Sequence, residues 1–255
     1  MIDQGQCLLS VVIPVRDEED GIIDALEALR AWKDCEIVVA IDPACRDASA
    51  ERAASVPGVR IVTSALSGRG ATLEAGARAA RGRYLLFLHA DSRIAEDAVG
   101  AAMSRLRAGT VAAAFRVRLD SRRPVFRLLE AGINLRSRLF SLPYGDQGLL
   151  ISQAELARGG GYRPLRRCED LDLVLRLRRL GRIALAPGPC STSTRRWDRE
   201  GVLAVTAKNL IALARFLATG AVRDGDRDRD ELEPVPAESD RRRELSPVDR
   251  RSARG

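Results

Sequence analysis

The chain has 255 residues, of which 45% are hydrophobic and 30% are charged, and its formal net charge is +7. This length and apolar content support one sizeable globular domain and exclude a chain that is disordered throughout. Nearly all of the positive charge is arginine, since Lys33 and Lys208 are the only lysines. The arginines are spread over most predicted helices with few aromatic residues among them, so we expect no nucleic-acid partner.

Short runs rich in Val, Ile and Leu alternate with longer helix-like segments through the first half of the chain. This alternation is the pattern of a parallel sheet that is covered on both faces. The predicted strands are 8–15, 36–41, 59–63 and 83–89, and the predicted helices are 20–31, 48–55, 69–80 and 95–107.

The pattern changes after a further predicted strand at 111–119. Next come an arginine-bearing amphipathic helix (124–140), a short strand in GLLIS, a helix (169–180), a strand in RIALAP and a long helix (199–219). The sequence beyond Gly220 is charged, contains proline and is nearly devoid of large apolar residues. We therefore predict one domain over 1–220 and a disordered tail over 221–255.

The cysteines and the N-terminus bear on location. The cysteines are odd in number and form no C-x-x-C pair, which favours a reducing cytoplasm; they are Cys7, Cys35, Cys45, Cys168 and Cys190. The N-terminus lacks the positive stretch of a signal peptide, and no uncharged apolar run is long enough to span a bilayer. We expect a cytoplasmic protein, either soluble or peripheral at the inner face of the membrane.

Acidic side chains follow three of the predicted strands. Asp17 and Glu19 follow the first, Asp42 and Asp47 the second, and Asp91 the fourth. The carboxyl ends of the strands are where ligands bind in an open α/β sheet. A dinucleotide-binding fingerprint or a phosphate loop would require spaced glycines, or a terminal G-K-[ST], that the loops after the strands lack. Carboxylates in their place imply that any bound phosphate is neutralised through Mg²⁺ or Mn²⁺.

Five stretches occur in an order that is similar to a known family: LSVVIPVRDEED, EIVVAIDPACRD, GRYLLFLHADS, YGDQGLLISQAELARGGGYRPLRRCEDLDLVLRLRRLGRI and STSTRRWDREGVL. Over about residues 8–219 the chain resembles the family 2 glycosyltransferases, most closely a small cytosolic subgroup associated with radical-SAM and selenoprotein-type genes. The resemblance implies an α/β GT-A fold over 1–220, with a Rossmann-like, mostly parallel central sheet and helices on both faces. It also implies transfer of a sugar, with inversion, from a nucleotide diphosphate sugar to a hydroxyl acceptor.

The resemblance assigns roles to particular positions. Asp42 matches the acid that contacts the nucleoside base, and Asp91, beside His89, matches the metal-binding motif. Glu169 and Asp170 match the family's acidic pair, of which Asp170 is the general base. The sequence departs from the family pattern in the PACR loop after Asp42, at Thr72 and Glu74, and in lacking a late histidine, because His89 is the only histidine.

Each assignment has a structural alternative. Glu169 and Asp170 also suit the positive N-terminal end of a helix, Asp91 is suited to an N-cap, and His89 to a packed strand end. The combination of motifs at family spacing favours the functional interpretation for the acidic pair and, less strongly, for Asp91. For His89 the sequence favours neither interpretation over the other.

The predicted donor-binding set contains further residues with open alternatives. Asp17 and Glu19 either line the nucleotide pocket or charge the first turn of a helix. The turn at Gly145, Asp146 and Gln147 either contacts a sugar or is only a turn. Arg195 and Arg196 either clamp the diphosphate or are solvated, and Trp197 stacks on a sugar in the same functional interpretation. Pro14 and Arg69 complete the set.

Two segments, 124–140 and 201–220, each combine an apolar stripe with cations. Core packing is the default interpretation, and contact with anionic lipid, which would suit a lipid-linked acceptor, is the alternative. The rival function for the whole chain is a catalytically inactive nucleotide-sugar-binding or membrane-surface module of the same fold.

Overall fold

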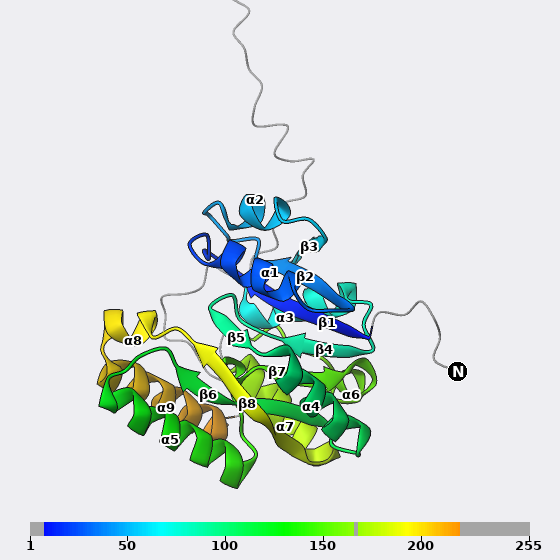
Figure 1. Ribbon diagram of the computed structural model, residues 1–255. Helices are drawn as coiled ribbons and strands as arrows, with labels where there is room; N and C mark the ends of the chain where they lie inside the picture. The colour runs from blue at the N-terminus through cyan, green and yellow to red at the C-terminus, as the bar shows by residue number, and fades with distance from the viewer. Residues whose placement is uncertain (1–7, 166–167, 220–255) are drawn as a thin grey trace, which may run out of the picture.

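The computed structural model describes residues 8–165 and 168–219, so the predicted tail over 221–255 lies outside the described residues. Its centre is one eight-stranded sheet in the order β3-β2-β1-β4-β7-β6-β8-β5 (Figure 1). The strands are β1 (Leu9–Val15), β2 (Cys35–Ile41), β3 (Val59–Thr63), β4 (Tyr84–Phe87), β5 (Ser92–Ile94), β6 (Ala112–Leu119), β7 (Leu149–Ser152) and β8 (Ile183–Thr192).

The pairing of the strands explains which of their ends meet. β1 pairs in parallel with β2 and β4, β2 with β3, and β6 with β8. β7 is antiparallel to both β4 and β6, and β5 is antiparallel to β8. The predicted mostly parallel sheet is confirmed, and the carboxyl ends of β1, β2 and β4 lie at one edge.

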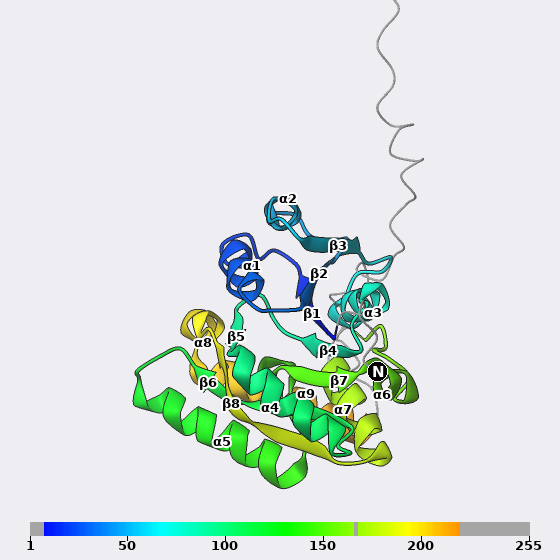
Figure 2. The same ribbon diagram turned by 45° about the vertical axis from the view of Figure 1, so that its right-hand side comes forward.

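Helices cover both faces of the sheet, as predicted. They are α1 (Ile22–Arg30), α2 (Ser49–Ala54), α3 (Arg69–Ala79), α4 (Glu96–Arg107), α5 (Pro124–Phe140), α6 (Gln153–Arg158), α7 (Glu169–Leu180), α8 (Arg195–Glu200) and α9 (Val202–Thr219). Figure 2 shows α1 on one side of β1 and β2 and α3 on the other. None of the helices among the described residues is long and apolar enough to cross a membrane.

Alternation along β1 divides the core between the two faces. Val11 and Ile13 pack in the cluster that includes α1 and α4, whereas Val12 packs in the cluster that includes α3 and α7. All three side chains are fully buried. Burial of a residue of this size contributes about 1.5–3 kcal/mol relative to an exposed one, so a strand that is apolar on both faces is favoured only inside such a three-layer arrangement.

The structure differs from the sequence prediction mainly after residue 180. The helix predicted over 199–219 is two helices, α8 and α9, which separate at Gly201, where φ is 88°. The strand predicted in RIALAP continues to Thr192 and pairs with β5. β5 has only three residues and α6 only six, and both escaped prediction because such short elements carry little periodic signal.

Candidate active site

Arg69 joins three segments at the carboxyl edge of the sheet. It is the first residue of α3, and its Nη2 lies 2.9 Å from His89 Nδ1, just beyond β4. Its Nε lies 3.3 Å from Glu169 Oε1, at the start of α7. Because a guanidinium group only donates hydrogen bonds, Nδ1 of His89 must accept, which leaves the ring proton on Nε2. Burial, together with the charge of Arg69, holds the pKa of His89 well below its usual 6.5, so the ring is neutral.

Gly145 lies against the predicted catalytic residue. A Cβ at this position would lie 2.2 Å from Asp170 Oδ2 and 3.0 Å from His89 Nε2. These two side-chain atoms are therefore no more than 5.2 Å apart. The backbone N–H of Gly145 also donates a hydrogen bond to the Asp170 carboxylate. The structure thus brings Asp170 close to His89. His89 follows the end of β4 and precedes Asp91 by two residues.

The acidic pair is poised to accept a proton. Burial, and next the charge of Asp170, raise the pKa of Glu169 to about 7, against the lowering effect of Arg69. Burial also raises the pKa of Asp170, although Arg69 and the hydrogen bonds from Gly145 and Tyr162 oppose it. A carboxylate with a raised pKa is a stronger base than an ordinary aspartate, which is the property that general-base catalysis near neutral pH requires.

Tyr162 is a site residue that the sequence analysis missed. Its hydroxyl donates a hydrogen bond to Asp170, and its ring is buried edge-on against Phe87, with the centroids 4.9 Å apart. Glu74 Oε2 accepts a hydrogen bond of 2.9 Å from the Tyr162 backbone N–H. Glu74, noted above only as a departure from the family pattern, therefore positions the loop that holds Asp170. The signal was the tyrosine that directly follows three glycines in GGGY.

Asp91 and Glu18 are the residues that best fit a divalent cation. Asp91 Oδ1 accepts hydrogen bonds from Ser92 (3.2 Å) and Thr192 (3.4 Å). Burial, and then the neighbouring charge of Asp91, raise the pKa of Glu18, so the two carboxylates are near enough to repel each other. Paired carboxylate oxygens suit Mg²⁺ or Mn²⁺. His89 fits less well than predicted, because its Nδ1 lone pair is already engaged by Arg69 and its Nε2 carries the proton.

The residues predicted to line the nucleotide pocket tie two loops together. Asp17 Oδ1 accepts from the Arg46 backbone N–H (2.8 Å), and Glu19 Oε2 accepts from that of Ala48 (3.2 Å). Although burial acts to raise it, hydrogen bonds from Ser49 and the Glu19 N–H lower the pKa of Asp47 to about 2. These bonds hold the loop after β1 against the loop after β2.

Asp17, Cys45 and Asp47 also form the single group of three potential metal ligands among residues 8–165 and 168–219. All three side chains already take part in hydrogen bonds within these loops, which accounts for their proximity without an ion.

Asp42 is buried at the end of β2. Its carboxylate accepts hydrogen bonds from Ser67 Oγ (2.8 Å) and from the backbone N–H groups of Gly68 (2.8 Å) and Ala44 (2.9 Å). In this arrangement it shapes the loop that leads into α3 and Arg69, and its contact with a base stays a prediction. Pro14, at the end of β1, lies half-buried beside Ala40 in the register of the sheet.

Gln147 has a structural role in place of the predicted ligand contact. It is fully buried, its Oε1 accepts from Ser137 Oγ (2.6 Å), and its Nε2 donates to the Phe115 carbonyl (2.9 Å). These bonds engage both ends of the amide, which fastens the turn (η1, Gly145–Gln147) to α5 and β6.

Asp146 and Arg136 remain available to a ligand. Asp146 Oδ1, and Nε and Nη2 of Arg136, are buried without a hydrogen-bond partner. The Arg136 guanidinium lies 3.6 Å from the centroid of the Tyr144 ring. Buried polar groups are nearly always hydrogen-bonded, so this cluster offers donors and an acceptor to an incoming group. The sequence analysis did not select Arg136, because nothing in its helical spacing distinguishes it from the other arginines of α5.

The RRW stretch divides in the structure. Arg195 reaches the start of α1, since its Nη2 lies 3.5 Å from the Cβ position of Gly21, and its charge acts on Glu18. The side chain of Arg196 lies outside the described residues. Trp197 packs beside Phe126 in a hydrophobic cluster, which supports packing and not the predicted stacking on a sugar.

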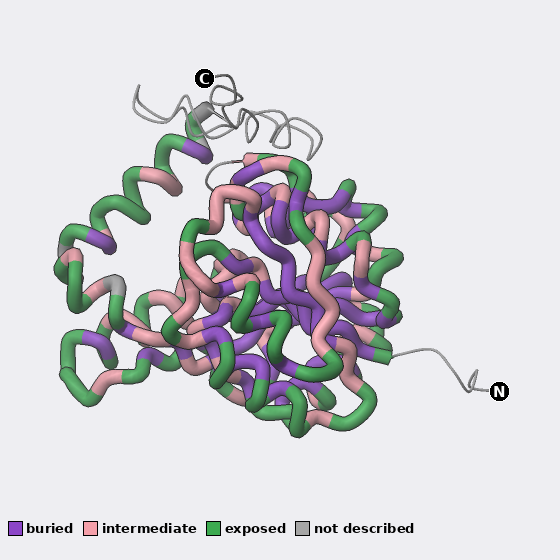
Figure 3. Tube along the Cα trace, turned by 90° about the horizontal axis from the view of Figure 1, so that it is seen from above, coloured by how far each residue is buried: buried purple, intermediate pink, exposed green. Residues whose placement is uncertain are grey.

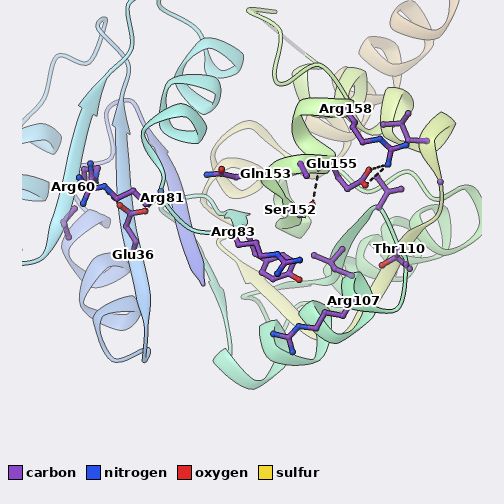
Figure 4. A pocket seen from close by; sticks show the side chains of 18 of the residues that line it. Glu36, Arg60, Arg81, Arg83, Arg107, Thr110, Ser152, Gln153, Glu155 and Arg158 are labelled. Carbon is purple, nitrogen blue, oxygen red and sulfur yellow. Dashed lines mark hydrogen bonds and ion pairs between the residues drawn. The ribbon is translucent and has the colours of Figure 1, made fainter. Parts of the chain in front are cut away.

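A cleft of about 1600 Å³ lies at the opposite edge of the sheet (Figure 4). Its carboxylates are already paired, Glu36 with Arg60 at 3.0 Å and Glu155 with Arg158 at 2.7 Å. Arg107 ends α4 here, where the negative end of a helix dipole favours a cation. The charges of this cleft therefore have structural causes, and none of the predicted site residues lines it.

The sheet order, the helices on both faces and the carboxylates gathered at the strand ends define an α/β protein of GT-A type. A family model described as Glycosyl transferase family 2 matches residues 10–167, and the chain belongs to this family. No curated protein sequence matches it.

Three solved structures with a similar fold illustrate the likeness. TarS 1-349 from S. aureus in complex with UDP is 17% identical, with a TM-score of 0.59, over 73% of this chain and 60% of that one. The mannosyltransferase PcManGT from Pyrobaculum calidifontis, with GDP-Man and Mn²⁺, is 17% identical, with a TM-score of 0.56, over 81% and 65%. Glucosyl-3-phosphoglycerate synthase from Mycobacterium tuberculosis, with Mn²⁺, UDP and glucosyl-3-phosphoglycerate, is 20% identical, with a TM-score of 0.51, over 80% of each chain. The chain thus spans less than two thirds of the length of the first two proteins.

Proposed function

We propose that this protein is a metal-dependent, inverting glycosyltransferase that moves a sugar from a nucleotide diphosphate sugar to a hydroxyl acceptor. Membership of the family and the neighbours crystallised with UDP, UDP-GlcNAc or GDP-Man support the donor class. The observation that carries the proposal is the position of Asp170, which has a raised pKa and is held by Gly145 and Tyr162 at the edge where β4 ends. In this proposal the catalytic unit spans residues 1–220, acts in the cytoplasm and belongs to the small radical-SAM and selenoprotein-associated subgroup.

The proposed reaction needs a base for the proton of the acceptor hydroxyl and positive charge for the departing diphosphate. Asp170 accepts the proton of the acceptor hydroxyl while that oxygen forms a bond to the anomeric carbon of the sugar. The bond from this carbon to the diphosphate oxygen breaks on the opposite face, and the electron pair leaves with the diphosphate. Inversion follows because attack and departure occur on opposite faces. Arg69 and Arg195, which both act on Glu18 beside Asp91, are placed to bind the diphosphate.

Asp91 and Glu18 would hold the divalent cation. A bound Mg²⁺ or Mn²⁺ would act as a Lewis acid that stabilises the charge developing on the leaving diphosphate. Mn²⁺ is present in two of the neighbours, which supports the choice of ion. Asp91→Ala should weaken donor binding in the presence of Mn²⁺ and have little effect on binding in EDTA.

The acceptor would approach from the side of α5. The unpartnered atoms of Arg136 and Asp146 suit the hydroxyl groups of a polyol or sugar, because a hydroxyl both donates and accepts. We include a lipid-linked acceptor in the proposal. Delivery of such an acceptor would require the protein to contact a membrane peripherally.

The test compares Asp170→Asn with the wild-type protein. Hydrolysis and transfer should be followed with a panel of nucleotide sugars in Mn²⁺ and Mg²⁺, and donor binding by thermal shift. The Asn variant should lose at least about 10²-fold in turnover and keep its donor affinity. Asp24→Asn, on the exposed surface of α1, is the matched control and should behave as wild type. Turnover of the Asn variant at the wild-type rate would remove Asp170 from the mechanism.

The second candidate is a nucleotide-sugar-binding module without turnover. It is favoured by the engagement of Asp42 with its own loops. Such a protein would be stabilised by nucleotide sugars and would hydrolyse none of them in either metal ion.

A further inference from the structure

Exposed large hydrophobic side chains are concentrated on two helices. Among the described residues, nine such side chains are exposed, and seven of them belong to α5 and α9. They are Val125 (40% exposed), Leu128 (77%), Leu135 (56%), Leu139 (64%) and Phe140 (57%) on α5, and Leu210 (60%) and Ile211 (52%) on α9. We name this set the apolar face. A concentrated exposed apolar surface usually marks an interaction site.

The spacing on α5 shows that the apolar face is separate from the core. Leu128, Leu135 and Leu139 are seven and four residues apart, so they lie along one side of the helix. A different side packs on β6, through Phe126 and its contacts with Val117 and Leu119. These three leucines therefore lie on a different side of α5 from the residue that packs on the sheet.

Helix α9 begins close to the start of α5. Val202, at its start, packs with Phe126 of α5, and Arg123 just before α5 pairs with Asp198 of α8 at 3.0 Å. Both helices lie at the end of the molecule away from β1–β3 (Figure 1), and Figure 3 shows α9 projecting beside the body of the domain with much of its length exposed.

Cations border the apolar face, and its one acid is turned inward. Arg138 lies along one border of the stripe on α5, whereas the guanidinium of Arg127 is turned inward to Glu130 and to the carbonyls of Leu119 and Ser121. Glu130 accepts hydrogen bonds from the Leu119 backbone N–H and from Arg127 (2.8 Å), so its charge is neutralised against β6. The sequence of α9 contains no acidic residue and two cations, Arg215 and Lys208, of which Lys208 pairs with Glu200 of α8 at 2.8 Å.

We propose that the apolar face binds peripherally to the surface of an anionic lipid bilayer, with its leucines inserted at the level of the headgroups. Apolar side chains flanked by arginine and lysine are the composition of a helix that lies in a membrane interface. A second copy of the chain is a poorer occupant, because the cations of one copy would meet a face that presents no outward acid: α9 has none and Glu130 is turned to β6.

This inference deepens the proposed function, on which its acceptor rests. The end of α5 is only five residues from Gly145, which contacts Asp170. A membrane that covers Leu139 and Phe140 would therefore lie close to the site of proton transfer. The structure thus favours a lipid-linked acceptor whose hydroxyl is presented at the bilayer surface.

The test measures co-flotation of the full-length protein with vesicles. Wild type should float with vesicles of phosphatidylglycerol and phosphatidylcholine in equal parts, and much less with phosphatidylcholine alone or in high salt. Leu128→Gln, Leu135→Gln and Leu139→Gln together should lower the partition coefficient on the order of tenfold or more, because each removes apolar surface from the bilayer. Arg138→Gln alone should lower binding to the anionic vesicles selectively.

The control is Ile23→Gln, which replaces an exposed apolar residue (39%) on α1, outside the apolar face, and should leave flotation unchanged. Thermal shift with nucleotide sugars should be identical for all the variants, so a failure of vesicle binding is distinguished from a failure of the proposed reaction. Absence of wild-type flotation would overturn the inference. So would sedimentation that shows a stable dimer abolished by the triple substitution, because the apolar face would then be covered by a second copy.

Discussion

Gly145→Ala tests whether Asp170 occupies the position that the proposed mechanism requires. The new Cβ would lie 2.2 Å from Asp170 Oδ2 and 2.9 Å from Asp170 Cγ. Comfortable contact between non-bonded heavy atoms begins at about 3.5 Å, so the carboxylate must move by roughly 1 Å. A displacement of about 1 Å in a catalytic group can lower the rate by about 10²-fold. We therefore expect a turnover loss of that order with donor affinity unchanged.

The assay is metal-dependent hydrolysis or transfer with the best donor from the panel, together with thermal unfolding of each variant. Gly100→Ala is the matched control, because Gly100 is helical and exposed, and a Cβ there would have no neighbour within 4 Å. That control should keep full turnover and gain about 0.4–1 kcal/mol in free energy of unfolding. A folded Gly145→Ala variant with wild-type turnover would show that the position of Asp170 does not limit the reaction.

Three further substitutions test other contacts. Tyr162→Phe removes a hydrogen bond that lowers the pKa of Asp170. The acid limb of the kcat–pH profile should therefore move to higher pH, and kcat should fall by roughly tenfold. An acid limb at the wild-type pH would contradict the hydrogen bond between Tyr162 and Asp170. Gln147→Ala removes three hydrogen bonds, those with Ser137 Oγ, the Tyr144 backbone N–H and the Phe115 carbonyl, and should cost about 3 kcal/mol in urea unfolding. Gln153→Ala, which loses one bond to Ala80, should cost about 1 kcal/mol. The pKa of Asp47 is lowered from 3.8 to about 2, so the stability that its carboxylate gives to the fold is complete above pH 3.8 and is lost as the pH falls toward 2. In Asp47→Asn the free energy of unfolding should therefore depend less steeply on pH in that window. A dependence as steep as that of the wild type would contradict this role.

Helix bounds could be predicted where the sequence carries several agreeing signals. The segment 169–180 begins with acids and ends with arginines before Gly181, and α7 has these bounds. The helix predicted over 199–219 failed because apolar periodicity continues across Gly201, whose positive φ separates α8 from α9. A local backbone conformation of this kind leaves no trace in hydrophobic spacing.

The candidate site could be predicted as a set of strand ends but not as a set of contacts. Parallel pairing brings the residues after β1, β2 and β4 to one edge, whatever their side chains are. Which acid of the loop after β1 lies near Asp91 depends on the path of that loop: the charge of Asp91 acts on Glu18, whereas Asp17 and Glu19 bond to the loop after β2. Tyr162 and Arg136 reach the site through tertiary packing, which no spacing in the sequence encodes.

The basicity of Asp170 results from two opposed effects at the junction of α3 and α7. The helices start so close together that a Cβ at Gly70 would lie 2.1 Å from the Arg163 carbonyl oxygen and 3.2 Å from Glu169 Cβ. Two positive helix ends and Arg69 therefore act on the acidic pair and favour the ionised carboxylates. Burial acts in the opposite direction and prevails, because the pKa values of both Glu169 and Asp170 are raised. A carboxylate whose pKa was raised by burial alone would be protonated at neutral pH. A carboxylate exposed to solvent beside Arg69 would have too low a pKa to accept the proton.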